Sequence, residues 1–99
     1  MLNITKKVEN TSLTIGLSGK LDTVTSPQLE TEIKESINGI TLLTFDLAEL
    51  EYVSSAGLRV LLSAQKIMNV QGKMVVKNVA EAVMDIFDVT GFSDILTIE

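Results

Sequence analysis

The stretch Tyr52-Val53-Ser54-Ser55-Ala56-Gly57-Leu58-Arg59-Val60-Leu61-Leu62 decides how the fold and function of this chain are interpreted. Adjacent serines and a glycine stand where an apolar strand passes into an amphipathic helix. At such a junction, backbone N–H groups and the positive end of the helix dipole face the serine hydroxyls. A phosphate on Ser55 would be well placed there, which makes Ser55 the candidate for a switch.

A simpler interpretation of this junction is purely structural. One serine caps the helix, which is worth about 1 kcal/mol, while Gly57 permits close packing of the helix on the sheet. No histidine is present to activate either hydroxyl, so nucleophilic catalysis is poorly supported. Local residues alone favour capping, and the functional alternative is a serine that accepts a phosphate from another enzyme.

Composition limits the chain to one domain, residues 1–99, and to few kinds of chemistry. Its 99 residues include 45% hydrophobic side chains, ample for a single core. The absence of cysteine and histidine excludes disulfides, Cys/His zinc sites and imidazole catalysis, and no metal or cofactor is expected. No apolar run reaches the length of a membrane span and no signal pattern is present, so we expect a cytoplasmic protein without membrane insertion.

The formal net charge of −5 argues against nucleic-acid binding. The eight basic residues are scattered except for Lys6-Lys7, whereas a nucleic-acid binder usually carries a basic stripe. Acidity favours solubility and suits a basic partner surface, but it identifies neither the partner nor the oligomeric state.

Alternation of apolar and polar residues predicts an opening hairpin. The strands run through Leu2–Val8, with Lys6 in an inward register, and through Leu13–Leu17. Glu9-Asn10-Thr11 forms the turn between them, and Ser18-Gly19-Lys20 interrupts the second strand.

A helix is predicted next, because Ser26 before Pro27 is a typical start signal with the serine as N-cap. Apolar residues then recur at four-residue spacing, and Asn38-Gly39 closes the helix.

The second half of the chain alternates buried strands with helices. The predicted segments are a strand at Ile40–Leu47 covered on both faces, a helix at Ala56–Val70 ended by Gln71-Gly72, a strand at Met74–Val76, a helix bearing Val83, Ile86 and Phe87 and stopped by Gly91, and a final strand with Ile95, Leu96 and Ile98. The order β-β-α-β-α-β-α-β implies an α/β fold with a mixed, mostly parallel sheet of four to five strands and helices packed on it.

Acidic residues near the serines have both structural and functional interpretations. The segment Gly19–Thr23 is interpreted structurally as a strand end with an Asx-type turn. Functionally, it would bring Asp22 to the same end of the sheet as Ser55, where it would orient the hydroxyl or the metal ion of a phosphate donor. Asp46 and Glu49 are interpreted as solvated loop charges before the serines. No carboxylate pair has a sequence argument for a raised pKa.

Leu62 is the unusual residue of the predicted helix at Ala56–Val70. At 100° per residue it falls nearly opposite the apolar stripe, and Leu58 falls on the border. An ordinary scattered surface leucine is one interpretation. The other is a partner-binding patch beside Ser55, formed by Leu58, Arg59 and Leu62.

Two motifs together give this chain a resemblance to a known family. They are Gly19-Lys20-Leu21-Asp22, followed by Thr25 and Leu29, and Asp46-Leu47 through Tyr52–Leu58. In this order and spacing they resemble the STAS domain family over nearly the whole chain, and within it the bacterial anti-sigma factor antagonists.

The resemblance implies a phosphorylation-controlled binding protein rather than an enzyme. Ser55 matches the position phosphorylated by an anti-sigma factor that is a serine kinase of the histidine-kinase ATPase type. The unphosphorylated form binds this anti-sigma factor and frees the sigma factor, the phosphorylated form lets go, and a metal-dependent (PPM-type) serine phosphatase resets it. Asp22 matches an acidic position near the phosphosite, and Gly57 and Leu58 match the start of the switch helix.

The chain departs from the family pattern on both sides of Ser55. Ser54 stands where such antagonists often have Asp, and Ala56 stands where they often have Ser or Thr. Ser54 is therefore an alternative phosphate acceptor. The alternative function is that of a STAS adaptor subunit, not phosphorylated, in a lipid-transport or other multiprotein regulatory complex.

Overall fold

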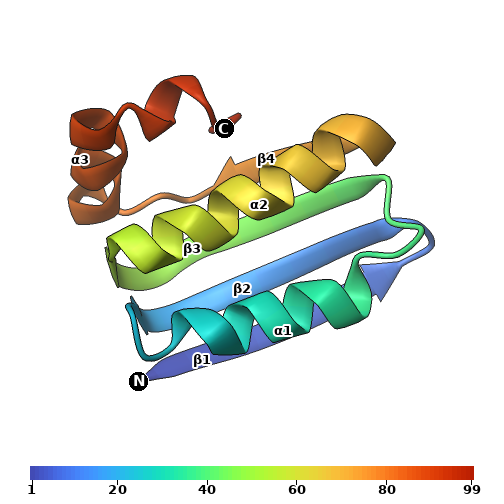
Figure 1. Cartoon of the computed structure of the whole chain (residues 1–99), viewed down its shortest axis with the longest axis horizontal. Helices are drawn as coiled ribbons and strands as arrows, with labels where there is room; N and C mark the ends of the chain where they lie inside the picture. The colour runs from blue at the N-terminus through green and yellow to red at the C-terminus, as the bar shows by residue number, and fades with distance from the viewer.

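A four-stranded sheet in the order β1-β2-β3-β4 forms the back layer of the molecule, and α1 and α2 lie across one of its faces (Figure 1). The computed structural model describes residues 1–99. Its elements are β1 Leu2–Glu9, β2 Ser12–Leu21, α1 Ser26–Ser36, β3 Leu42–Val53, α2 Ser55–Gln71, β4 Lys73–Lys77, α3 Glu81–Thr90 and a 3-10 helix at Phe92–Asp94.

The opening hairpin forms as predicted, with β1 and β2 antiparallel and Asn10 in the left-handed region at the turn (φ 56°). The predicted interruption at Ser18-Gly19-Lys20 is an irregularity within β2, which continues to Leu21: its pairing with β3 shifts register between Gly16 and Ser18 and between Gly19 and Lys20. Gly19 has φ +100°, and a Cβ at this position would lie 2.2 Å from the carbonyl oxygen of Met1. A glycine thus allows an irregular strand to continue here, where other residues would be strained.

The parallel strands are covered by α1 and α2 on one face only, which corrects the prediction of a strand covered on both faces. β3 pairs in parallel with β2 and with β4. On the helix-facing side, Leu43, Phe45 and Leu47 are fully buried, whereas Thr44 and Asp46, which point the other way, are half-buried. Thr44 and Asp46, the polar residues within the apolar segment of β3, therefore lie on the face that the two helices leave uncovered.

The start of α1 differs from the prediction in its capping residue. Pro27 lies in the first turn, as expected, but Thr25 occupies the N-cap position. Ser26 is buried, and its hydroxyl donates a hydrogen bond to the Asp22 carbonyl oxygen. The serine therefore ties the helix to the preceding loop instead of capping it.

The predicted final strand is wrong, because the chain after α3 forms a 3-10 helix and then an extended tail. Gly91, with φ +81°, ends α3 as predicted. In the tail, Ile98 makes a single parallel bridge with Val76, and Leu96 is buried in the core. Two backbone hydrogen bonds join the tail to Val76: the Val76 N–H donates to the Thr97 carbonyl oxygen, and the Glu99 N–H donates to the Val76 carbonyl oxygen. They are too few to make a fifth strand.

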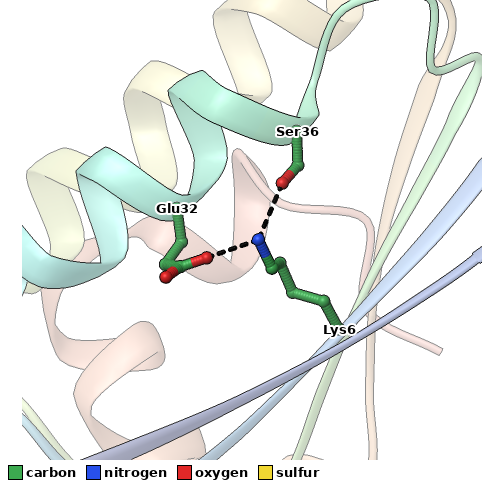
Figure 2. A network of polar contacts seen from close by, with 3 residues as sticks. All are labelled: Lys6, Glu32 and Ser36. Atoms are coloured by element: carbon green, nitrogen blue, oxygen red, sulfur yellow. Dashed lines mark hydrogen bonds and ion pairs between the residues drawn. The ribbon is translucent and has the colours of Figure 1, made fainter.

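The outer edge of β1 carries an inward-facing lysine, as the alternation predicts. Lys6 reaches from the strand to α1, where its ammonium group pairs with the Glu32 carboxylate and donates to the Ser36 hydroxyl at 3.1 Å (Figure 2). An inward-pointing charge of this kind discourages an open edge strand from pairing with another chain.

Candidate functional site

The ends of β2 and β3 bring the two sequence motifs together at one edge of the sheet. Leu21 pairs with Val53 in the parallel register, and the Ser54 N–H donates to the Leu21 carbonyl oxygen at 2.8 Å. Figure 1 shows the β2–α1 loop and the start of α2 side by side at this end. Asp22 and Ser55, 33 positions apart in the sequence, therefore follow adjacent strand ends.

Gly57 sets how closely α2 approaches the sheet. A Cβ at this position would lie 2.7 Å from Leu21 Cγ and 3.0 Å from the Leu21 carbonyl oxygen. Contacts this short are not tolerated, so only glycine permits the observed approach. The prediction that Gly57 allows close helix–sheet packing is confirmed, and its partner is the last residue of β2.

Ser54 is the N-cap of α2. Its backbone is extended (φ −88°, ψ 175°), and its hydroxyl oxygen accepts a hydrogen bond from the Gly57 N–H at 3.3 Å. Its carbonyl oxygen accepts from the Leu58 N–H at 2.9 Å, the first bond of the helix. With the side chain half-buried and engaged, Ser54 performs the structural role expected of a capping serine.

Ser55 differs from its neighbour in exposure and in bonding. It is the first residue of α2, its side chain is exposed, and its hydroxyl has no hydrogen-bond partner within the chain. The junction thus contains one serine used for capping and one that is free. The free hydroxyl stands at the positive end of the helix dipole.

Asp22 organises the loop between β2 and α1. Its carboxylate oxygen Oδ1 accepts hydrogen bonds from the backbone N–H groups of Val24 and Thr25, each at 3.0 Å, and from the Thr25 hydroxyl at 3.1 Å. The Thr25 N–H is the main cause of a lowered Asp22 pKa, which partial burial opposes. No hydrogen bond joins Asp22 to Ser55, so the bonded partners of this carboxylate are loop residues.

The three residues predicted to contact a partner have different surroundings. Leu58 is 6% exposed and belongs to the core, so its side chain contributes little to the surface. Leu62 is half-buried, and Arg59 is exposed. Of the predicted patch, Arg59 is the member that lies free beside Ser55.

Sequence reasoning missed two exposed apolar side chains at this end of the sheet. Val24, in the loop shaped by Asp22, is 85% exposed, and Tyr52, next to the last residue of β3, is 45% exposed. The available signal was an apolar residue inside a polar turn, since Val24 is flanked by Thr23 and Thr25.

Asp46 and Glu49 lie within β3, which corrects their interpretation as charges of a loop. Asp46 Oδ1 accepts from the Ala48 N–H at 3.1 Å and from the Asn78 side-chain amide at 3.2 Å. The pairing of β2 with β3 shifts register in this segment, and the Asp46–Ala48 bond holds the irregular backbone.

No group of three or more acidic, histidine or cysteine side chains is arranged to hold a metal ion. None of the helices combines the length and the apolar character needed to cross a membrane.

Comparison with known proteins places this geometry in a family. The model of the STAS domain matches residues 3–99. BtrV of Bordetella bronchiseptica, described as a candidate anti-sigma factor antagonist, is 36% identical over 84 residues, which are 83% of this chain and 72% of BtrV.

Solved structures share the fold. An anti-sigma factor antagonist from Mycobacterium paratuberculosis superposes with a TM-score of 0.89 at 21% identity, covering 99% of this chain and 85% of that one. The phosphorylated form of the Bacillus cell fate determinant SpoIIAA has a TM-score of 0.76 at 19% identity, covering 98% and 91%.

Proposed function

Because this chain belongs to the STAS domain family, we propose that it is a cytoplasmic anti-sigma factor antagonist controlled by phosphorylation of Ser55. The unphosphorylated chain binds an anti-sigma factor with serine kinase activity and releases the sigma factor. The phosphorylated chain does not bind, and a PPM-type serine phosphatase restores it. The chain is a substrate of these two enzymes and has no catalytic role of its own.

The different hydrogen bonding and exposure of Ser54 and Ser55 support the proposal. Ser54 Oγ accepts the Gly57 N–H and is half-buried, whereas Ser55 Oγ is exposed and has no partner. A kinase can therefore reach Ser55 without unwinding the helix cap. The new Oγ–P bond forms as the bond between the β and γ phosphates of ATP breaks, the hydroxyl gives up its proton, and ADP leaves.

The switch works through added charge. A phosphoserine brings a charge of about −1.5 to −2 and three acceptor oxygens to an exposed position. Val24, in the loop that follows the neighbouring strand end, is 85% exposed, and an exposed apolar side chain of this kind is suited to a desolvated contact. A partner that covers both Val24 and Ser55 would have to desolvate the phosphate. A loss of about 3 kcal/mol weakens binding more than a hundredfold.

The test begins by identifying the kinase. A Ser55→Ala bait, which cannot be switched off, is used to isolate the binding partner from the native host. The purified partner is then incubated with ATP and with wild-type, Ser55→Ala or Ser54→Ala protein, and the phosphate is mapped by mass spectrometry.

We expect phosphate on Ser55 in the wild type and in Ser54→Ala, and none in Ser55→Ala. The Ser54→Ala variant is the matched control, because it removes the adjacent hydroxyl and keeps the other. Equal incorporation into Ser55→Ala and wild type would assign the phosphate to another residue and reject the proposal.

A further inference from the structure

Ser55 and Arg59 lie one turn apart on the solvent-facing side of α2. Both are exposed, as are Ser63 and Lys66 farther along the same face. The ion pairs of the structure all involve lysines, and Arg59 takes part in none of them. A chain with 13 acidic residues thus leaves its one helical arginine near Ser55 without a partner.

The direction of helical side chains favours contact between these two positions. Residues at i and i+4 are neighbours on a helix surface, about 5–6 Å apart between Cβ atoms. Side chains lean toward the helix N-terminus, so the Arg59 side chain covers the turn that begins with Ser55. An anion placed N-terminal to a cation at this spacing is the more favourable order.

We propose that Arg59 is an intramolecular latch that pairs with the phosphoryl group when Ser55 is phosphorylated. The proposal rests on Ser55 being the modified residue. A guanidinium group is suited to this role, because its planar fork donates two parallel N–H bonds to phosphate oxygens.

The latch gives phosphorylation a second effect on the partner. In the unphosphorylated chain, Arg59 is free to donate hydrogen bonds to an acidic group of the partner. In the phosphorylated chain, the same donors are occupied by the phosphate. Modification of one residue therefore both adds a negative charge and withdraws a positive one from the contact surface.

The other charges at this end of the molecule do not replace Arg59. Asp22, in the loop beside α2, and Glu30, in α1, are acidic and disfavour the phosphate. The Glu30 carboxylate is paired with Lys34, with 3.8 Å between Oε1 and Nζ. The positive charge of the N-terminal ammonium group helps to lower the pKa of Asp22. Lys20 belongs to β2, where it pairs with Tyr52, and its neighbour Leu21 points into the core under Gly57. Alternation along the strand therefore directs Lys20 away from α2.

The experiment installs phosphoserine at position 55 by genetic encoding, so no kinase is needed. The second pKa of the phosphate is measured by phosphorus NMR titration in four proteins: an otherwise unchanged chain, Arg59→Gln, Arg59→Lys and Lys66→Gln. Lys66→Gln is the matched control, since it removes the same charge from the same helix face. Lys66 lies about 16 Å from Ser55 along the helix axis, which is beyond the Debye length of about 8 Å.

Pairing with Arg59 stabilises the dianion and lowers the phosphate pKa. We expect Arg59→Gln to raise this pKa by about 0.3 of a unit, the shift equivalent to one exposed pair at this spacing. Lys66→Gln should leave it unchanged within about 0.1 unit, and Arg59→Lys should retain part of the effect. Added salt at 1 M should remove most of the difference.

Equal phosphate pKa values in Arg59→Gln and Lys66→Gln would overturn the latch. This outcome is separate from the fate of the proposed function. If the kinase does not modify Ser55, the function proposal fails while the NMR comparison still measures the pairing. If Ser55 is the phosphosite and the pKa values are equal, the switch stands without a latch.

Discussion

The β2–α1 loop and the β3–α2 junction lie side by side at the same edge of the sheet, and both contain polar residues that begin a helix. In the first, the side chains of Asp22, Thr25 and Ser26 all form hydrogen bonds within the loop. In the second, Ser54 caps the helix while Ser55 remains free. The β2–α1 loop also has an exposed hydroxyl without a hydrogen-bond partner, that of Thr23, but only the free hydroxyl of Ser55 belongs to a helix.

The difference teaches that a hydroxyl stands out as a candidate when it is free of hydrogen bonds and also lies at a helix start. A hydroxyl that satisfies backbone N–H groups cannot be modified without a cost in helix stability. An adjacent hydroxyl that makes no bond carries no such cost. The β2–α1 loop instead presents an apolar side chain, since Val24 is 85% exposed at the same end of the sheet.

The largest expected effect is the loss of partner binding when a permanent charge is placed at Ser55. Ser55→Asp places a permanent carboxylate at the free position, and we expect it to bind the anti-sigma factor at least tenfold more weakly than Ser55→Ala, with full phosphorylation exceeding a hundredfold. Calorimetric titration of both variants with the purified partner measures the ratio. Matching affinities would count against a charge-driven switch.

The next effect concerns the contact that holds the two regions together. Gly57→Ala inserts a Cβ 2.7 Å from Leu21 Cγ, so we expect a loss of about 1–3 kcal/mol from overpacking. Alanine is otherwise the better helix former by about 1 kcal/mol, so the sign is diagnostic. Urea denaturation gives the free energy of unfolding, with Ser63→Ala, on the exposed face of α2, as the control. A stabilised Gly57→Ala protein would mean that α2 lies farther from β2.

A smaller effect separates the two serines in stability. We expect Ser54→Ala to lower the free energy of unfolding by about 1 kcal/mol because the Gly57 N–H loses its acceptor. Ser55→Ala should change it by less than about 0.5 kcal/mol. Thermal or urea unfolding of the two variants tests this directly, and the reverse order would mean that Ser55 provides the cap.

The smallest effect is the pH dependence of the stability that Asp22 contributes in the β2–α1 loop. The Asp22 pKa is lowered in the folded chain, mainly by the Thr25 N–H. The carboxylate therefore contributes its stabilisation above its unfolded pKa of about 3.9 and loses it as the pH falls through the lower folded value. We expect Asp22→Asn to be less stable than wild type at pH 7, with the gap closing below about pH 4. A gap that stays constant down to pH 2 would contradict this role.

Much of the fold follows from periodicity and punctuation that are local to the sequence. The hairpin turn at Asn10, the first turn of α1 with Pro27 and the end of α3 at Gly91 were predicted from residues that impose their own backbone geometry. The prediction of a final strand failed because apolar residues do not by themselves specify strand pairing: Leu96 is buried without pairing, and Ile95 is 46% exposed. Whether they pair with β4 depends on how α3 directs the chain, which their own pattern does not contain.

The candidate site divides in the same way. Its two motifs identify an edge of the sheet with hydroxyls at a helix start, because parallel strands direct their carboxyl ends to one side. The burial of Leu58 and the exposure of Val24 were not predictable from spacing. They depend on how far α2 is rotated and how closely it approaches β2.

By itself, then, the sequence determined the strands and helices from β1 to α3, and that Ser54 and Ser55 begin a helix beside the Asp22 turn. These features depend on backbone preferences and on repeats within a few residues. Only the tertiary structure decided which serine caps the helix, that Leu58 is buried and that the single arginine, Arg59, makes no ion pair. The physical reason is the close contact of Gly57 with Leu21, 36 positions away, which sets the approach of α2 to the sheet.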